Sequence, residues 1–231
     1  MLLRVYYIHE YLCLVNSAQE VKELIEIAIK NDCLLVEGMW SRLLPTYKQA
    51  KNWIEEGRIG EILNIRVEKS KRKNYFDQDK RKRVIWDYGI YPLSFVQFFF
   101  KHIEISNSSV NFIEGLDSDW HITMTNGKQF ASIDISGRYD GDSKAYIVGS
   151  HGMIVFDRNF NSTSTVSLYN ISGELIDKKI FKYISEGFEY EIQAVNDAIK
   201  KGSKEIESLS LKDTCKVIGL MEQLTAEVPN V

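Results

Sequence analysis

Residues 119–136 read DWHITMTNGKQFASIDIS, and this stretch decides the fold class. Two runs in which apolar and polar residues alternate flank Asn126-Gly127, a strong short-range signal for a β-hairpin. The same alternation extends outward over residues 103–181, where β-branched residues are frequent. Further turn signals lie at Asp140-Gly141, Ser150-His151-Gly152 and Ser172-Gly173. The middle of the chain is therefore predicted to be all-β.

Helical patterns flank this β section. Ser17 and Glu20 have capping-box spacing ahead of an apolar stripe that ends near residue 30. Pro45 suits the first turn of a second helix, which Gly57 ends. The apolar run 85–100 predicts a buried helix, and two amphipathic helices, 188–201 and 211–224, close the chain. Short strands are predicted at Cys33–Val36 and Ile62–Val67.

The order of these elements predicts an α+β fold. We expect an open mixed or antiparallel β-sheet with helices packed on one face. No repeat or Pro/Gly/Ser-rich linker divides the chain. Since the other face of such a sheet needs cover, a homodimer or higher oligomer that associates through the sheet face is predicted.

Composition excludes several classes of protein. Hydrophobic residues make up 44% and charged residues 26%, with a formal charge of −3, as in ordinary globular proteins. No membrane span, signal peptide or nucleic-acid-binding motif is visible, so a cytoplasmic protein without membrane or nucleic-acid partners is expected. Three dispersed cysteines and four scattered histidines predict neither a disulfide framework nor a metal site.

Five motifs, in order along the chain, resemble one enzyme family. The sequence resembles the glucose–fructose oxidoreductase/inositol dehydrogenase (Gfo/Idh/MocA) family, in the branch of the dihydrodiol dehydrogenases. The likeness begins near His9 and continues almost to the C-terminus. The motifs are LLVEGMWSR at 34–42 with Pro45, GRIGEI at 57–62, DYGIYPL at 87–93, IVGSHGMI at 147–154 and GFEYEI at 187–192.

This resemblance implies a substrate domain that works beside a Rossmann domain and uses NAD or NADP. The printed sequence contains no G-x-G-x-x-G phosphate-binding turn. The expectation is therefore a truncated chain in which residues 1–16 are a remnant of the end of a Rossmann-type domain. Residues 17–231 would be the substrate and oligomerisation domain. Tight binding of NAD or NADP by this chain alone is not expected, and a separate Rossmann-bearing chain is a conceivable partner.

The family resemblance also assigns candidate site residues. Its Glu-Lys-Pro motif matches Glu10-Tyr11-Leu12, so Tyr11 stands where the family has a proton-transferring lysine. Tyrosine, with an ordinary pKa near 10 and no positive charge, is a poor substitute. Asp87 and Tyr91 match the substrate-orienting aspartate and the acid/base tyrosine. Structural roles are equally open, because Asp87 could cap a helix and Tyr91 could be a core aromatic.

Three further positions complete the candidate cofactor region. Glu10, Trp40 and Arg42 match residues near the nicotinamide end of the family's cleft. A packed tryptophan and an exposed arginine are the structural alternative.

The stretch Lys69–Arg83 is unusually basic, with eight basic and two acidic residues. Arg81-Lys82-Arg83 replaces a glycine-rich run of the family directly before Asp87. One interpretation is a loop that binds an anionic or sugar-like small molecule. The other is a solvated, mobile loop.

Two functions from different classes remain. The chain is an oxidoreductase subunit for a sugar, sugar-nucleotide or polyol-like substrate, as Asp87 and Tyr91 suggest. Alternatively, it is a non-catalytic pseudoenzyme, a binding or scaffold subunit, as Tyr11 and Leu12 suggest.

Overall fold

The computed structural model describes residues 15–73, 83–100 and 102–226. Their centre is one eight-stranded sheet in the order β2-β3-β4-β1-β5-β6-β7-β8. Only β1 and β4 pair in parallel, and every other neighbouring pair is antiparallel. The strands are β1 Ile62–Ser70, β2 Glu104–Ile113, β3 Leu116–Thr125, β4 Phe130–Ser136, β5 Ala145–Gly149, β6 Gly152–Phe156, β7 Thr165–Asn170 and β8 Leu175–Ile180.

The predicted hairpin joins β3 to β4. Thr125 and Phe130 are the last paired residues, and Gly127 has a φ of 88°, which glycine adopts without strain. The side chain of Asn126 accepts the N–H groups of Lys128 and Gln129 and so fixes the turn.

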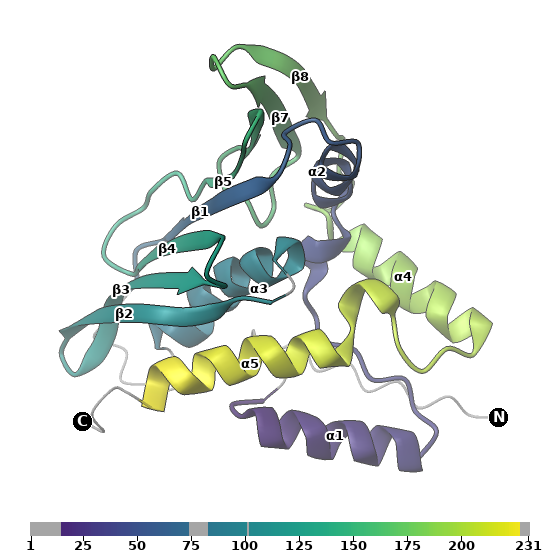
Figure 1. Cartoon of the computed structure of the whole chain (residues 1–231). Helices are drawn as coiled ribbons and strands as arrows, with labels where there is room; N and C mark the ends of the chain where they lie inside the picture. Colours follow the sequence, from purple (N-terminus) through teal and green to yellow (C-terminus); the bar gives the residue numbers. More distant parts are fainter. Residues whose placement is uncertain (1–14, 74–82, 101, 227–231) are drawn as a thin grey trace.

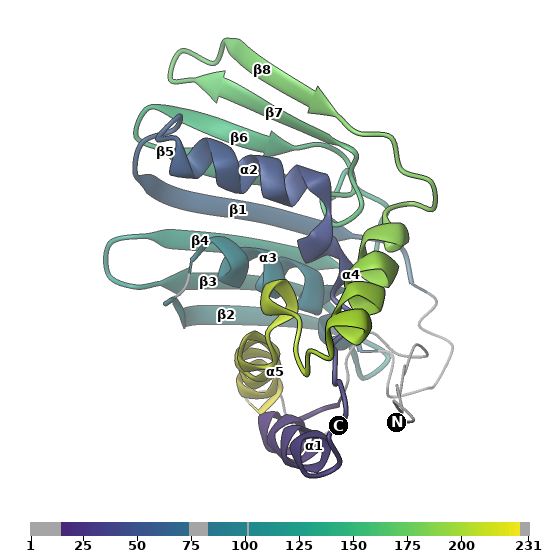
Figure 2. The same ribbon diagram turned by 90° about the vertical axis from the view of Figure 1, so that its right-hand side faces the viewer.

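Helices cover one face of this sheet, as Figures 1 and 2 show. α2 (Pro45–Glu55) and α3 (Ile90–Phe99) pack directly on the strands, whereas α4 (Phe188–Lys201) lies beside them. α5 (Leu211–Ala226) runs along the edge near β2 and carries α1 (Ala18–Lys30) on its far side. The fold prediction of a mixed sheet with helices on one face is confirmed.

The alternation of apolar and polar residues along the strands explains which face of the sheet the helices cover. The side chains of Ile65, Val67, Ile122, Ile133 and Ile135 are at most 2% exposed and point toward the helices. Arg66, Glu68 and Asp134 point to the other face, where they line a groove of about 400 Å³ with Tyr146, Val148 and Met153. Association of two copies through that face stays a prediction.

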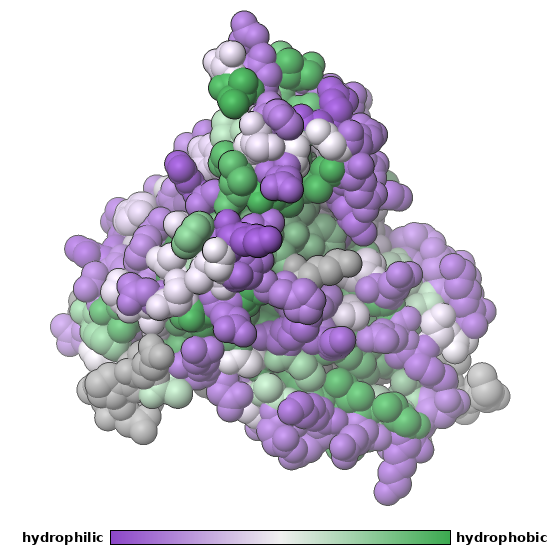
Figure 3. Space-filling view, viewed as in Figure 1, coloured by the Kyte–Doolittle hydropathy of each residue, from purple (hydrophilic) through white to green (hydrophobic). Residues whose placement is uncertain are grey.

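Hydrophobic surface also remains at the β7–β8 end of the sheet, where it alternates with hydrophilic surface in Figure 3. β8 is an edge strand in which Ile176 and Ile180 are 51% and 68% exposed.

Two predicted elements differ in the structure. Cys33–Val36 is not a strand, because the helices rather than a sheet ladder bury its apolar side chains, with Leu34 in the core. It connects α1 to the short 3₁₀ helix η1 (Trp40–Leu43). The predicted helix 85–100 is divided into a π-helical turn, η3 (Ile85–Gly89), and α3. The predicted boundary near residue 16 falls beside residues 1–14, which lie outside the described part.

Candidate functional site

The family-like residues Asp87 and Tyr91 lie where η3 and α3 approach the carboxyl end of β1. Backbone pairing with the β4 side continues past Ser70, because the N–H of Lys71 donates to Ser136 O at 3.0 Å and that of Lys73 to Gly137 O at 2.8 Å. This extension directs β1 toward η3. We name Lys69, Lys73, Asp87, Tyr88 and Tyr91 the β1–η3 corner.

Asp87 forms an ion pair with Lys73. The lysine side chain is only 9% exposed and the aspartate 26%. The Lys73 ammonium also lies over the ring of Tyr88, 5.5 Å from its centroid. Burial, followed by the negative charges of Asp87 and Asp140, raises the pKa of Tyr88, so its phenol stays protonated.

The capping role considered for Asp87 belongs to another residue. Asp117, a buried residue of β3, accepts the N–H groups of Val84 and Ile85 at 2.9 Å each. It also accepts the indole N–H of Trp120 at 2.7 Å. Asp117 thus fixes the start of the π-helical turn from across the fold, and the Asp87 carboxylate faces Lys73.

Tyr91 packs against the hydrophobic core, and Lys69 lies over its ring with Nζ 5.5 Å from the centroid. The ammonium of Lys69 donates to Asn161 Oδ1 at 2.8 Å. Burial, and then the like charge of Lys71, lowers the pKa of Lys69 to about 8. The sequence interpretation missed Lys69 and Lys73 as individual site residues, because their partners are 14 to 92 positions away.

The corner brings together a carboxyl group, two phenols and two amines. Carboxylates accept hydroxyl groups, and phenols and amines donate or accept protons. Such a set can orient a polyhydroxylated molecule.

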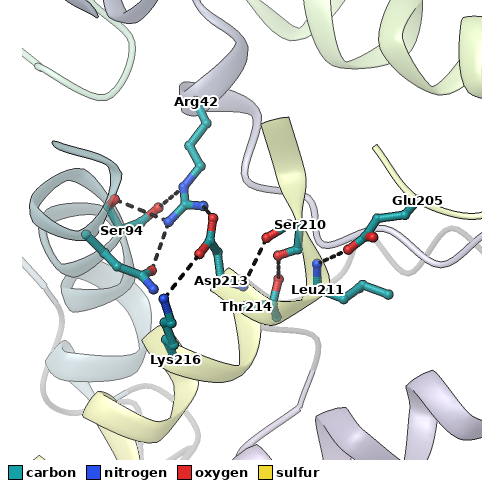
Figure 4. A network of polar contacts seen from close by, with 9 residues as sticks. Arg42, Ser94, Glu205, Ser210, Leu211, Asp213, Thr214 and Lys216 are labelled. Carbon is teal, nitrogen blue, oxygen red and sulfur yellow. Dashed lines mark hydrogen bonds and ion pairs between the residues drawn. The ribbon is translucent and has the colours of Figure 1, made fainter. Parts of the chain in front are cut away.

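Arg42, predicted near the cofactor, lies inside a closed polar network instead of at the surface (Figure 4). Its side chain is 4% exposed and ion-pairs with Asp213 of α5 at 3.3 Å. It also donates to Ser94 Oγ at 2.8 Å and Gln97 Oε1 at 3.0 Å, both on α3. Burial lowers the pKa of Arg42, opposed by Asp213, and the guanidinium remains charged near neutral pH.

The other predicted site residues are distributed as follows. Trp40 is 8% exposed and packs on Phe188, with ring centroids 4.5 Å apart. Arg83 is partly buried, and its carbonyl accepts the N–H of Asp87 at 3.1 Å. Glu10, Tyr11, Arg81 and Lys82 lie outside the described residues, so their roles stay predictions.

Two glycine motifs are explained by packing. The N–H of His151 donates to Ile59 O at 2.8 Å, so 57–62 and 147–154 contact each other. A Cβ on Gly149 would lie 2.1 Å from Ile59 O, a distance that no side chain tolerates. These motifs therefore specify the fold around β1 and β5 and do not contribute to the corner.

Within the described residues, no cluster of three or more His, Cys, Asp or Glu side chains has the arrangement of a metal site. None of the helices in the described part of the chain is both long and apolar enough to cross a membrane. A groove of about 620 Å³ lies between α5 and the β2–β3 pair, away from Asp87 and Tyr91.

Comparison with known proteins gives the fold a family context. Residues 47–155 match the family model described as the GFO/IDH/MocA C-terminal domain. The trans-1,2-dihydrobenzene-1,2-diol dehydrogenase of Xenopus tropicalis is 25% identical over 222 residues, which cover 91% of this chain and 67% of that protein. The sequence resemblance is thereby confirmed.

Solved structures have the same fold at low identity. A 3-ketoreductase from Actinomadura kijaniata, in complex with NADP and TDP-benzene, superposes with a TM-score of 0.80 at 16% identity, over 92% of this chain and 68% of that one. An aldose-aldose oxidoreductase from Caulobacter crescentus gives 0.78 at 13% identity, over 92% and 67%. The chain thus spans about two thirds of the length of these relatives.

Proposed function

The chain belongs to the GFO/IDH/MocA family through its C-terminal domain, and on this premise we propose that it is the substrate-binding part of an NAD(P)-dependent oxidoreductase. The substrate class is a sugar, sugar-nucleotide or polyol-like compound. The named relatives act on a diol, a ketone and aldoses, which supports a substrate with neighbouring oxygen functions.

The β1–η3 corner is the observation that carries this proposal. Asp87 is held by Lys73 and Tyr91 lies one helical turn further, close to Lys69. In this proposal Asp87 accepts a hydroxyl group of the substrate and Tyr91 exchanges a proton with the reacting oxygen.

NAD(P), when bound in this family, accepts or donates the hydride. Two of the residues that the family resemblance places near the cofactor already have partners within the protein. Arg42 is occupied by Asp213, Ser94 and Gln97, and Trp40 is packed on Phe188.

A non-catalytic binding subunit is the second candidate. Lys73 already occupies the carboxylate of Asp87, and Tyr11-Leu12 replaces the lysine and proline of the family motif. Both candidates use the corner to bind a ligand, but only the first involves turnover.

Calorimetric titration of the full chain with myo-inositol, D-glucose and UDP-glucose tests binding at the corner. Asp87→Asn and Tyr91→Phe should each weaken the best ligand roughly tenfold, the loss expected for one strong hydrogen bond. Tyr169→Phe, which changes a partly exposed phenol on β7, is the matched control. Unchanged affinity in both corner variants, or no binding by any of the three compounds, would contradict the proposal.

Turnover separates the two candidates. Following reduced nicotinamide absorbance with the bound compound and NADP⁺ detects an active subunit, and its loss in Tyr91→Phe assigns it to the corner. Turnover by the unmodified chain would exclude the non-catalytic candidate.

A further inference from the structure

Lys69 differs from the other cations of the corner in its surroundings. Its ammonium is placed by two contacts, the Tyr91 ring on α3 and the Asn161 amide oxygen on the loop after β6. Both partners are electrically neutral. Lys73, on the same strand extension, has the carboxylate of Asp87.

No carboxylate balances the charge of Lys69 within the described residues. The charged neighbour that influences it most is Lys71, which has the same sign. The groups in direct contact with its ammonium are the Tyr91 ring on α3 and the Asn161 amide oxygen on the loop after β6. A partly buried ammonium without a counter-charge is energetically unfavourable, and an anion at this position would relieve the cost.

The ammonium of Lys69 has N–H donors left that can bind such an anion. A lysine ammonium has three N–H groups, and Asn161 takes one of them. Lys69 is only partly buried, so part of its side chain faces solvent. Tyr91, the proposed acid/base group, lies directly beneath it.

We infer that Lys69 binds an oxyanion of the substrate, so that the corner selects sugar-like compounds that carry a carboxylate or a phosphate. This inference rests on the proposed function, because it places the anionic group next to the hydroxyl groups held by Asp87 and Tyr91. Lys69 is a specificity-determining residue: it contacts the substrate away from the bond that reacts.

The pH dependence of binding distinguishes Lys69 from ordinary surface lysines. The ligand anion binds the protonated amine, whose pKa lies at about 8 in the free protein. Affinity should therefore be constant below pH 7 and fall by up to roughly tenfold per pH unit above 8. Exposed lysines and arginines keep their charge across this range.

Calorimetric titration of the full chain with D-glucuronate, D-glucose 1-phosphate and D-glucose is the test. Glucuronate or the phosphate should bind at least roughly tenfold more tightly than glucose at pH 7. The compound that binds more tightly shows whether the preferred oxyanion is a carboxylate or a phosphate. Lys69→Met should abolish this preference, so that the affinity for glucuronate or the phosphate falls to that for glucose.

Lys71→Met is the matched control, because it removes an exposed cation from the same strand extension. It should keep most of the preference for the anion and its loss above pH 8. Circular dichroism of both variants verifies that they fold. An NMR titration of the Lys69 ammonium in the unmodified chain gives a second readout, since glucuronate should raise its pKa.

The outcomes separate the two proposals. Equal binding of glucose and glucuronate, lost in Asp87→Asn, would leave the proposed function standing and overturn the role of Lys69. The proposed role of Lys69 would also be overturned if the preference for the anion survives Lys69→Met, or if anion affinity does not fall above pH 8. Absence of binding by all three compounds would contradict both.

Discussion

Arg42 is buried and Lys69 is partly buried, but only Arg42 has a carboxylate that balances its charge. Arg42 joins η1 to α3 and α5 through an aspartate, a serine and a glutamine, and its side chain is 4% exposed. Lys69 has a neutral amide and an aromatic ring, with Lys71 as its charged neighbour. A charged side chain that is bonded to protein groups of opposite charge contributes to the fold. A charged side chain without such a partner is available to bind a ligand.

The largest effect is expected for Arg42→Met. Removing the guanidinium leaves buried acceptors on Ser94 and Gln97 without their donor, so the free energy of unfolding should fall by about 2–4 kcal/mol. Urea unfolding measures the loss. Arg58→Met, which breaks an exposed pair with Glu56, should change stability by less than about 0.5 kcal/mol. A similar loss in the two variants would contradict the comparison.

The next comparison concerns the carboxylates of Asp117 and Asp87, whose substitution should lower stability to different degrees. Asp117→Asn removes the acceptor of one of three N–H donors and should cost about 2 kcal/mol, with a change in Trp120 fluorescence. Asp87→Asn acts on a partly exposed pair and should cost less, about 1 kcal/mol. A reversal of this order in thermal or urea unfolding would show that η3 is not held by Asp117.

Lys69→Met should have the opposite sign to Arg42→Met. Because the folded-state pKa of Lys69 is depressed to about 8, the charged amine destabilises the fold below pH 8. Its replacement should raise the free energy of unfolding by about 1 kcal/mol at pH 7, after loss of the Asn161 hydrogen bond is subtracted.

This gain should disappear as pH rises from 8 toward 10.5, since the folded protein then releases the proton before the unfolded chain does. Urea unfolding at pH 7 and pH 10 measures the change. The exposed substitution Lys51→Met should give no such pH dependence, and a pH-independent gain in Lys69→Met would show that packing rather than charge is responsible.

The smallest effect is expected in the binding of NAD(H) and NADP(H). Arg42 is fully engaged and the printed sequence has no glycine-rich phosphate turn, so NAD(H) and NADP(H) should bind the 231-residue chain no more tightly than about millimolar. Calorimetric titration checks this prediction, and low-micromolar binding of either cofactor would refute it.

The sequence by itself determined the elements whose signals are local. The Asn126-Gly127 turn, the capping box of Ser17 and the helix end at Gly202 are predicted correctly, because neighbouring residues create these structures through their own hydrogen bonds and backbone angles. Five other motifs, one of them at residues 87–93, indicated the family and selected Asp87 and Tyr91 as positions of interest.

Only the tertiary structure decided what those positions contact. It paired β1 with β4 in parallel, brought Lys73 to Asp87, and placed Asp117 at the start of η3. It also buried Arg42, which the sequence suggested for a cofactor site, and made Cys33–Val36 a connection instead of a strand. The physical reason is that charge compensation and burial depend on residues far apart in the sequence, whereas turns and caps depend on their neighbours.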